Sequence, residues 1–286
     1  MNPSHARILL TGARGMLAAD VADALRAAAA TDMVLTDRDD LDILDADAVA
    51  IAVAGRDLVI NCAAFTAVDA AEDEEDVAYA VNAIGPRNLA RAAAAAGARM
   101  VHISTDYVFA GDATEPYAED APMNPVGAYG RTKAAGEAAV RESGADALIL
   151  RTAYLYGRGG PCFPKTIAKA GRERGALSVV DDQIGQPTWT RDVADFMLRL
   201  LAADAPAGTY HATSAGQCSW YDFAKEVVAS AGLRDIVSPT DSSGSARKAP
   251  RPAWSVLGHT AHEALGIEGI GDWRERWAVA AQEVLA

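Results

Sequence analysis

The sequence predicts an α/β protein, with a Rossmann-type doubly wound parallel sheet and a smaller C-terminal substrate-binding lobe. Three observations lead to this class. Short apolar segments alternate with long helix-forming segments through residues 1–155. A glycine turn follows the first apolar segment. Beyond residue 155, glycines and prolines interrupt shorter segments, which is typical of a separate lobe.

The strand candidates are short, apolar and bounded by turns or helices. They lie at residues 7–11, 33–36, 58–61, 99–104, 147–151 and 209–212. The two most prominent helical segments are residues 75–96 and 129–143. We expect a dinucleotide-binding domain at residues 1–155, to which segments near 189–215 return. Residues 156–286 then form mainly the substrate-binding lobe.

The first strand candidate leads into a turn with glycines at fixed spacing. Gly12 permits a tight turn, and Gly15 lets the backbone approach a pyrophosphate at the N-terminus of the next helix. Ala18 is the third small residue, which allows close packing of helix on strand. A strand, turn and helix that binds no ligand fits the same spacing, so this motif alone does not show that the chain binds a dinucleotide.

An acidic residue ends the second strand candidate. Asp37 can accept hydrogen bonds from both hydroxyls of the adenosine ribose, which favours NADH because a carboxylate repels a 2′-phosphate. Arg38 follows directly and offers such a phosphate a guanidinium. The expected cofactor is therefore NADPH or NADH, and these two residues do not decide between them.

Three side chains have the chemistry of a hydride-transfer site. Thr105 ends a strand candidate, and Tyr129 and Lys133 are four residues apart on one helix face. The ammonium is expected to lower the pKa of the phenol, which then donates a proton to a carbonyl oxygen. The Thr105 hydroxyl can hold the same oxygen. Many solvated helices carry a Tyr and a Lys at this spacing, so the neighbouring motifs matter.

Composition favours a soluble cytoplasmic enzyme. Half of the 286 residues are hydrophobic, yet no run is long enough to span a membrane, and the first residues do not have the pattern of a secretory signal. The net charge of −13 argues against nucleic acid and acidic membranes as partners. The three cysteines and five histidines have no metal-binding or disulfide spacing, so we expect reduced thiols and no metal.

Six further segments follow one another along the chain, at residues 57–69, 102–109, 150–157, 182–188, 251–252 and 272–275. In this order they resemble the extended short-chain dehydrogenase/reductases, and among them the dTDP-4-dehydrorhamnose reductase family. The resemblance runs nearly end to end. Several segments together are far more specific than the glycine turn alone.

Together with the glycine turn, the resemblance implies two sets of contacts. The cofactor contacts are Gly12, Gly15, Met16, Leu17, Asp37, Arg38, Asp42, Ile43, Ala63, Ala64, Phe65, Thr66, Tyr129 and Lys133. The substrate contacts are Thr105, Asp106, Tyr154, Gln183, Gln186 and Arg251. Arg251 also has a physical claim, because a guanidinium matches diphosphate oxygens. The alternative for Arg251 is a surface residue in a proline-rich loop.

The activity that the resemblance implies is reduction of the C4 ketone of a dTDP-4-keto-6-deoxyhexose. NADPH or NADH delivers hydride, Tyr129 protonates the oxygen, and Lys133 tunes Tyr129 and binds the nicotinamide ribose. The expected assembly is a monomer or weak homodimer.

Three residues depart from the family pattern. Tyr154 stands where a Trp is usual near the sugar, and Trp254 where an Asn is usual. Both leave the redox chemistry intact but leave the sugar and the face of hydride delivery open, so a 4-ketoreductase of an antibiotic deoxysugar pathway is an alternative. Arg191 stands where some dimeric relatives have an acidic residue that helps to bind metal, which argues against a metal-linked dimer.

Other readings of the same motifs fit less well. A nucleotide-sugar 4,6-dehydratase needs a second carboxylate after Asp106, where this chain has Tyr107. A 4-epimerase keeps its cofactor tightly through two half-reactions, whereas the segments resemble a reductase that exchanges it. A non-catalytic NADP-binding regulatory subunit is a third alternative, against which the intact Thr105, Tyr129 and Lys133 argue.

Overall fold

A parallel sheet organises the protein, as a computed structural model of the chain shows. The model describes all residues except 2, 234 and 245–246. In this described part, six strands follow the order β10-β5-β4-β3-β1-β2, and every neighbouring pair is parallel. The strands are β1 Ile8–Thr11, β2 Met33–Thr36, β3 Leu58–Asn61, β4 Arg99–Thr105, β5 Ala147–Thr152 and β10 Gly208–His211. The predicted Rossmann-type class is confirmed, and each predicted strand is present.

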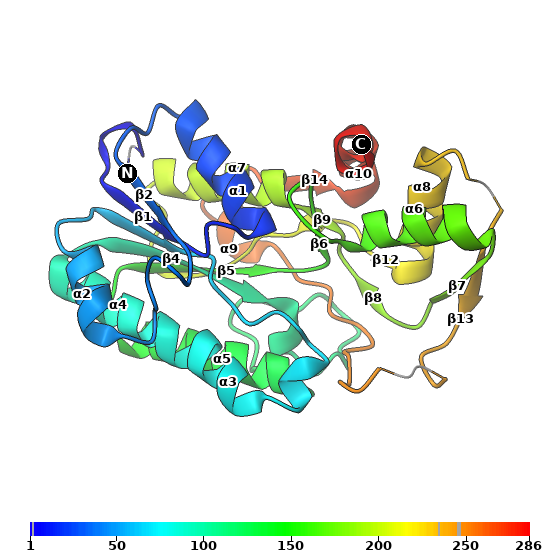
Figure 1. Cartoon of the computed structure of the whole chain (residues 1–286), viewed down its shortest axis with the longest axis horizontal. Helices are drawn as coiled ribbons and strands as arrows, with labels where there is room; N and C mark the ends of the chain where they lie inside the picture. The colour runs from blue at the N-terminus through cyan, green and yellow to red at the C-terminus, as the bar shows by residue number, and fades with distance from the viewer. Residues whose placement is uncertain (2, 234, 245–246) are drawn as a thin grey trace.

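Helices cover both faces of this sheet (Figure 1). One face carries α1 (Met16–Ala27) and α7 (Thr190–Ala202), which share an apolar cluster with the strands. The other face carries α2 (Ala46–Val53), α4 (Gly85–Ala96) and α5 (Ala128–Glu142). Because both faces are covered, strands such as β1 and β3 are buried along their whole length, which accounts for their continuous apolar sequence.

The long helical segment predicted at residues 75–96 is interrupted. It consists of α3 (Glu75–Tyr79), a π-helical turn (Ala80–Ile84) and α4. Pro86 lies at the start of α4 and has no N–H to donate to the carbonyl of Asn82, so the regular helical ladder cannot continue there. Such turns often occur at functional sites, and this one directs Asn82 into the interior.

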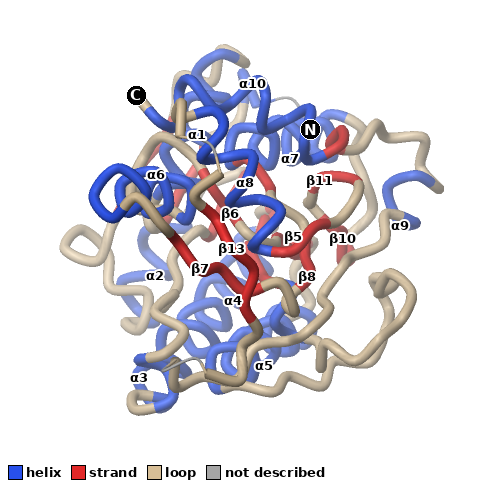
Figure 2. The backbone as a smooth tube through the Cα atoms, turned by 90° about the vertical axis from the view of Figure 1, so that its right-hand side faces the viewer, coloured by secondary structure: helices blue, strands red, loops and turns tan. Residues whose placement is uncertain are grey.

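The smaller lobe has a core of its own. Helices α6 (Phe163–Arg174), α8 (Trp220–Ser230) and α10 (Trp273–Leu285) pack around Phe223 and Trp277. Figure 2 shows this lobe facing the viewer. Its short strand pairs are β7 (Leu177–Val180) with β13 (Val237–Thr240) and β8 (Ile184–Gly185) with β12 (Cys218–Ser219).

The remaining elements are short. They are β6 (Leu155–Tyr156), β9 (Thr188–Trp189), β11 (Ser214–Ala215), β14 (Ile270–Asp272), α9 (Thr260–Glu263) and the short helical turns Pro3–His5, Ala70–Glu72 and Asp106–Val108. Between them the chain crosses back, so that α7 packs on α1 and β10 joins the sheet edge beside β5. Among the helices of the described residues, none combines the length and the apolar character that crossing a membrane requires.

Candidate active site

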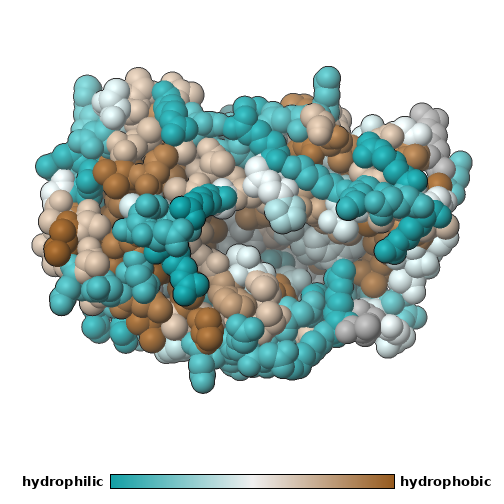
Figure 3. Space-filling view, viewed as in Figure 1, coloured by the Kyte–Doolittle hydropathy of each residue, from teal (hydrophilic) through white to brown (hydrophobic). Residues whose placement is uncertain are grey.

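A large cleft opens at the carboxyl ends of the sheet strands. Its volume is about 1230 Å³, and it is lined by both the sheet domain and the smaller lobe. Figure 3 shows the hollow near the middle of the molecule. The chain order reverses between β1 and β3, which is where ligands bind in doubly wound sheets. A pocket for one drug-sized ligand has roughly 300–1,000 Å³, so this cleft has room for more than one ligand.

Most of the predicted site residues line this cleft. All of the predicted cofactor contacts do so, together with Thr105, Asp106 and Tyr154. The other predicted substrate contacts, Gln183, Gln186 and Arg251, do not line it. The structure thus brings the cofactor set together, whereas it separates half of the substrate set from the cleft.

The glycine turn makes a cradle at one end of the cleft. Gly12 has a φ of 71°, and a Cβ there would lie 2.6 Å from the main-chain nitrogen of Ala63, so only glycine fits. Gly15 is the N-cap of α1. It has no side chain that could accept hydrogen bonds from the N–H groups in the first turn of the helix. Free N–H groups at the positive end of a twelve-residue helix suit a pyrophosphate, so this part of the cleft fits a dinucleotide.

The segment beside this turn, residues 63–66, is held by two buried asparagines. The Asn61 side-chain oxygen accepts from the Thr11 hydroxyl at 2.8 Å and from the Ala63 N–H at 3.1 Å. The Asn82 amide exchanges two hydrogen bonds with the main chain of Phe65, at 2.8 and 3.1 Å. Sequence reasoning did not identify Asn82. An asparagine four residues before a proline, within a helical segment, was the available signal.

Acidic and basic side chains gather where the adenosine ribose is expected. The two carboxylate oxygens of Asp37 accept the main-chain N–H groups of Arg14 and Arg38, at 2.9 and 2.8 Å. These hydrogen bonds lower the Asp37 pKa, so the carboxylate is charged at neutral pH. The Arg14 guanidinium forms an ion pair of 2.8 Å with Asp39, and both side chains are exposed.

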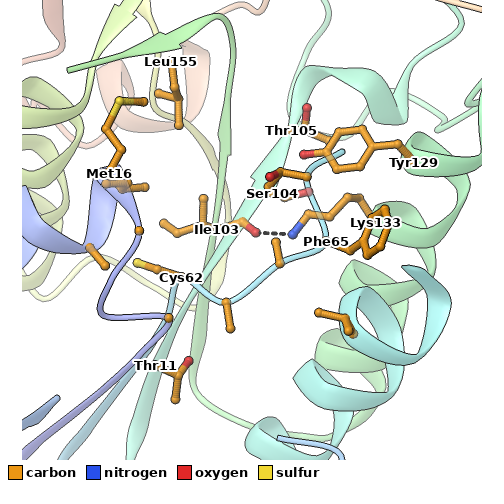
Figure 4. Close-up of a pocket in the computed structure, with 18 of the residues that line it drawn as sticks. Thr11, Met16, Cys62, Phe65, Ile103, Ser104, Thr105, Tyr129, Lys133 and Leu155 are labelled. Atoms are coloured by element: carbon orange, nitrogen blue, oxygen red, sulfur yellow. Dashed lines mark hydrogen bonds between the residues drawn. The ribbon is translucent and has the colours of Figure 1, made fainter. Parts of the chain in front are cut away.

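The three predicted catalytic side chains converge in the middle of the cleft (Figure 4). Thr105 ends β4, whereas Tyr129 and Lys133 lie on the first turns of α5. Close packing of α5 makes this convergence possible, because a Cβ on Gly130 would lie only 2.2 Å from the carbonyl oxygen of Tyr107. The buried Lys133 ammonium donates to the carbonyl of Ile103 at 2.6 Å.

The pKa values of Tyr129 and Lys133 differ from the expectation. Burial raises the pKa of Tyr129 far above its usual value, and hydrogen bonding with Thr105 offsets only part of that effect. The predicted lowering of the phenol pKa by Lys133 is therefore wrong for this structure, in which desolvation dominates. Burial also lowers the pKa of Lys133 to about 8. At neutral pH the phenol carries its proton and the ammonium its charge, which is the protonation state that a proton donor needs.

Asp106 is a second titratable group beside the catalytic threonine. It is buried, and its carboxylate accepts from the Thr105 hydroxyl at 3.0 Å and from the Ser255 hydroxyl. Burial raises the Asp106 pKa to about 6, although both hydroxyls lower it. Ser255 follows the Arg251 segment, so this hydrogen bond ties the smaller lobe to the catalytic strand. Sequence reasoning did not name Ser255 as a site residue.

A buried carboxylate, Glu137, supports the catalytic helix from behind. It accepts from the Ser104 hydroxyl at 2.6 Å and from two nitrogens of the Arg151 guanidinium at 2.9 and 2.8 Å. Arg141 donates to the same carboxylate at 2.6 Å. Glu137 lies one helical turn beyond Lys133, and its charge raises the Lys133 pKa against the effect of burial.

The predicted substrate contacts outside the cleft have partners within the protein. Gln186 is buried, and its amide bonds to the main chain of Ser214 at 3.0 Å and of Leu257 at 3.2 and 2.8 Å. This use of the amide joins three segments of the lobe, which explains why Gln186 does not face the cleft. Gln183 is also buried.

Arg251 lies beside the cleft rather than in it. Its guanidinium forms a two-nitrogen ion pair with Asp69, at 3.1 and 2.9 Å, and donates to the carbonyl of Ala249 at 2.8 Å. Arg251 also hydrogen-bonds Tyr107, a residue of the cleft lining. The side chain is 10% exposed, so a ligand diphosphate can reach it only by replacing Asp69 or by contacting its remaining face.

The three departures from the family pattern have distinct environments. Tyr154 has a φ of 45° and stacks on Trp220 with ring centres 3.6 Å apart, and both rings line the cleft. Trp254 is away from the lining, near Tyr117. Arg191 pairs with Glu283 at 2.9 Å. Trp220 is a cleft residue that the sequence did not reveal.

Comparison with known proteins agrees with this geometry. The family model for the RmlD substrate binding domain matches residues 6–285. A dTDP-4-dehydrorhamnose reductase of Streptomyces griseus is 47% identical over 94% of this chain and 90% of its own length. A probable dTDP-4,6-dihydroxy-2-methyloxan-3-one 4-ketoreductase of Streptomyces antibioticus is 44% identical over 98% of this chain and 96% of its own.

A solved structure gives the same result in three dimensions. The dTDP-4-dehydrorhamnose reductase of Bacillus anthracis in complex with NADP is similar with a TM-score of 0.92 and 37% identity, covering 97% of this chain and 99% of that one. Fold, cleft and relatives together define an NAD(P)H-dependent oxidoreductase of the extended short-chain dehydrogenase/reductase class. Within it, the chain belongs to the RmlD substrate-binding domain family.

Proposed function

We propose that this protein reduces the C4 ketone of a dTDP-4-keto-6-deoxyhexose. One observation carries the proposal: Thr105, Tyr129 and Lys133 meet in a cleft that also holds the glycine turn and Asp37. NADPH or NADH, when bound, supplies the hydride that the ketone carbon receives. The names of the relatives support the nucleotide-sugar substrate.

Three side chains donate the proton, orient the ketone oxygen and stabilise the phenolate. Tyr129 holds a phenolic proton because burial raises its pKa, and it gives that proton to the C4 oxygen as the carbon is reduced. Thr105 hydrogen-bonds the phenol and is placed to orient the same oxygen. The charged Lys133 stabilises the phenolate that the transfer leaves behind. Bulk water then returns a proton to Tyr129.

Arg251 is the proposed contact for the diphosphate. The chain has a net charge of −13, so an anionic ligand needs a local concentration of positive charge. Arg251 and Arg247 supply it next to Tyr107, at the edge of the cleft. In this arrangement Asp69 holds the guanidinium ready in a two-nitrogen geometry that a diphosphate also accepts.

A second candidate is a 4-ketoreductase with different product stereochemistry. Tyr154, in place of the usual Trp, stacks on Trp220 in the cleft wall, so the surface that meets the sugar differs from the family pattern. The Streptomyces antibioticus relative, named as a 4-ketoreductase, favours this alternative.

The test is a product analysis. The protein is incubated with dTDP-4-keto-6-deoxyglucose and NADPH or NADH, with and without a 3,5-epimerase, and the product is identified by NMR. We expect cofactor oxidation and a C4 alcohol, and the dependence on the epimerase separates the two candidates. Tyr129→Phe is the matched control. Binding of cofactor without oxidation in any mixture would instead indicate the regulatory-subunit alternative.

A further inference from the structure

Two arginines line the ribose end of the cleft, and they differ in whether an ion pair is found for the guanidinium. Arg14 and Arg38 both line the cleft and lie on either side of Asp37, because its carboxylate accepts the main-chain N–H of each. The Arg14 guanidinium is paired with Asp39. For the Arg38 guanidinium, no ion pair or hydrogen bond is found with any residue that the structure describes.

Asp37 by itself favours NADH, because its charged carboxylate suits the free ribose hydroxyls and repels a 2′-phosphate. Its carboxylate closes the turn between two loops, and its own N–H donates to Asp40 at 3.0 Å. Its ribose-binding role applies to NADH, whereas NADPH carries the phosphate at that position. Binding of NADPH further requires a cationic side chain that can release its partner and accept the phosphate.

The Arg14–Asp39 ion pair has this property. The side chains are 66% and 74% exposed, and such exposed ion pairs contribute little to stability, so a phosphate dianion can replace Asp39 at small cost. Asp39 carries the same sign of charge as the phosphate. It therefore lowers the affinity for NADPH in two ways, by pairing with Arg14 and by repelling the phosphate.

We propose that Asp39 adds to the preference for NADH over NADPH by competing with the 2′-phosphate for Arg14, an inference that rests on the proposed reductase function. Arg38 gives the phosphate a second guanidinium, so NADPH still binds while Asp39 is present. NADH has no 2′-phosphate and does not need Arg14, so the affinity of the enzyme for NADH does not depend on Asp39.

A double-mutant cycle tests the proposal by direct binding. Dissociation constants of NADP⁺ and NAD⁺ are measured calorimetrically at low salt for wild type, Asp39→Asn, Arg14→Gln and the double variant. We expect Asp39→Asn to tighten NADP⁺ by about threefold or more and to leave NAD⁺ unchanged. Arg14→Gln weakens NADP⁺ by about tenfold, the loss expected for a charged hydrogen bond. In the Arg14→Gln background, the gain from Asp39→Asn shrinks to the part due to repulsion alone.

A matched control comes from the other end of the same strand. Asp32 precedes β2 and forms an exposed ion pair with Arg56 at 3.3 Å, so Asp32→Asn makes an equal change in charge far from the ribose. We expect it to change neither constant. The proposal is overturned if Asp39→Asn tightens both cofactors equally, leaves NADP⁺ unchanged, or has the same full effect without Arg14.

Discussion

The two ends of the cleft are built from different kinds of structure. The cofactor end uses residues that directly follow β1, β2 and β3, so chain order and spatial order coincide there. The substrate end uses a 3₁₀ turn, two-residue strands and the start of α8, which meet only through tertiary contacts. A motif at a strand end therefore predicted correctly which residues line the cleft, whereas the motifs in the irregular lobe did not.

The largest effect is expected at the junction of the two ends. Tyr129→Phe removes the proton donor and should lower kcat by about 100-fold or more, with the dissociation constant of NADPH nearly unchanged. Stopped-flow turnover and a binding titration measure the two quantities. Turnover close to wild type would show that another group protonates the ketone.

The pH dependence follows from Lys133, which belongs to the same junction. Its pKa is about 8, so the ammonium is charged below that pH and neutral above it. The neutral amine cannot stabilise a phenolate, and kcat should therefore fall by up to tenfold for each pH unit above about 8. A pH profile of kcat from 6 to 10 at saturating ligands measures this. A flat profile to the alkaline end would separate Lys133 from the proton transfer.

The substrate end is tested most sharply at the Arg251–Asp69 ion pair. Arg251→Ala should raise KM for the nucleotide sugar by about tenfold or more, on the order of 1.5–3 kcal/mol for a charged hydrogen bond. The dissociation constant of NADPH should barely change. Asp69→Asn is the matched partner variant. If it raises KM as much as Arg251→Ala does, the pair only clamps the lobe, and Arg251 does not hold the diphosphate.

Gln186 probes the same region with a smaller effect. Gln186→Leu leaves the carbonyl of Ser214 and both main-chain groups of Leu257 without their partner, which should cost about 1–3 kcal/mol of folding free energy. Because Gln186 does not line the cleft, KM should stay within twofold. Urea unfolding and steady-state kinetics check both statements. A stable variant with a strongly raised KM would restore Gln186 to the substrate contacts.

The smallest effect is expected from chelation. Arg191 pairs with Glu283 where some relatives have a metal-binding acid, and a guanidinium cannot ligate a cation. Activity and sedimentation coefficient should therefore be unchanged in EDTA. A loss that magnesium reverses would reveal a metal site elsewhere.

Local sequence determined the fold class and the cofactor end. Buried parallel strands must be apolar along their length, and the turns after them need glycine or a specific polar residue, so β1 to Asp37 could be identified residue by residue. Thr105, Tyr129 and Lys133 were found for the same reason, since strand end and helix spacing fix their directions.

Tertiary structure alone decided the pKa values and the substrate end. The sign of the Tyr129 pKa shift depends on how deeply α5 buries the phenol, which no spacing of residues specifies. Gln186 and Arg251 carry polar groups that suit a ligand, but folding supplies Ser214, Leu257 and Asp69 as partners from distant parts of the chain. Partners so remote in sequence are fixed by the packing of the lobe against the sheet, and local residue patterns do not encode that packing.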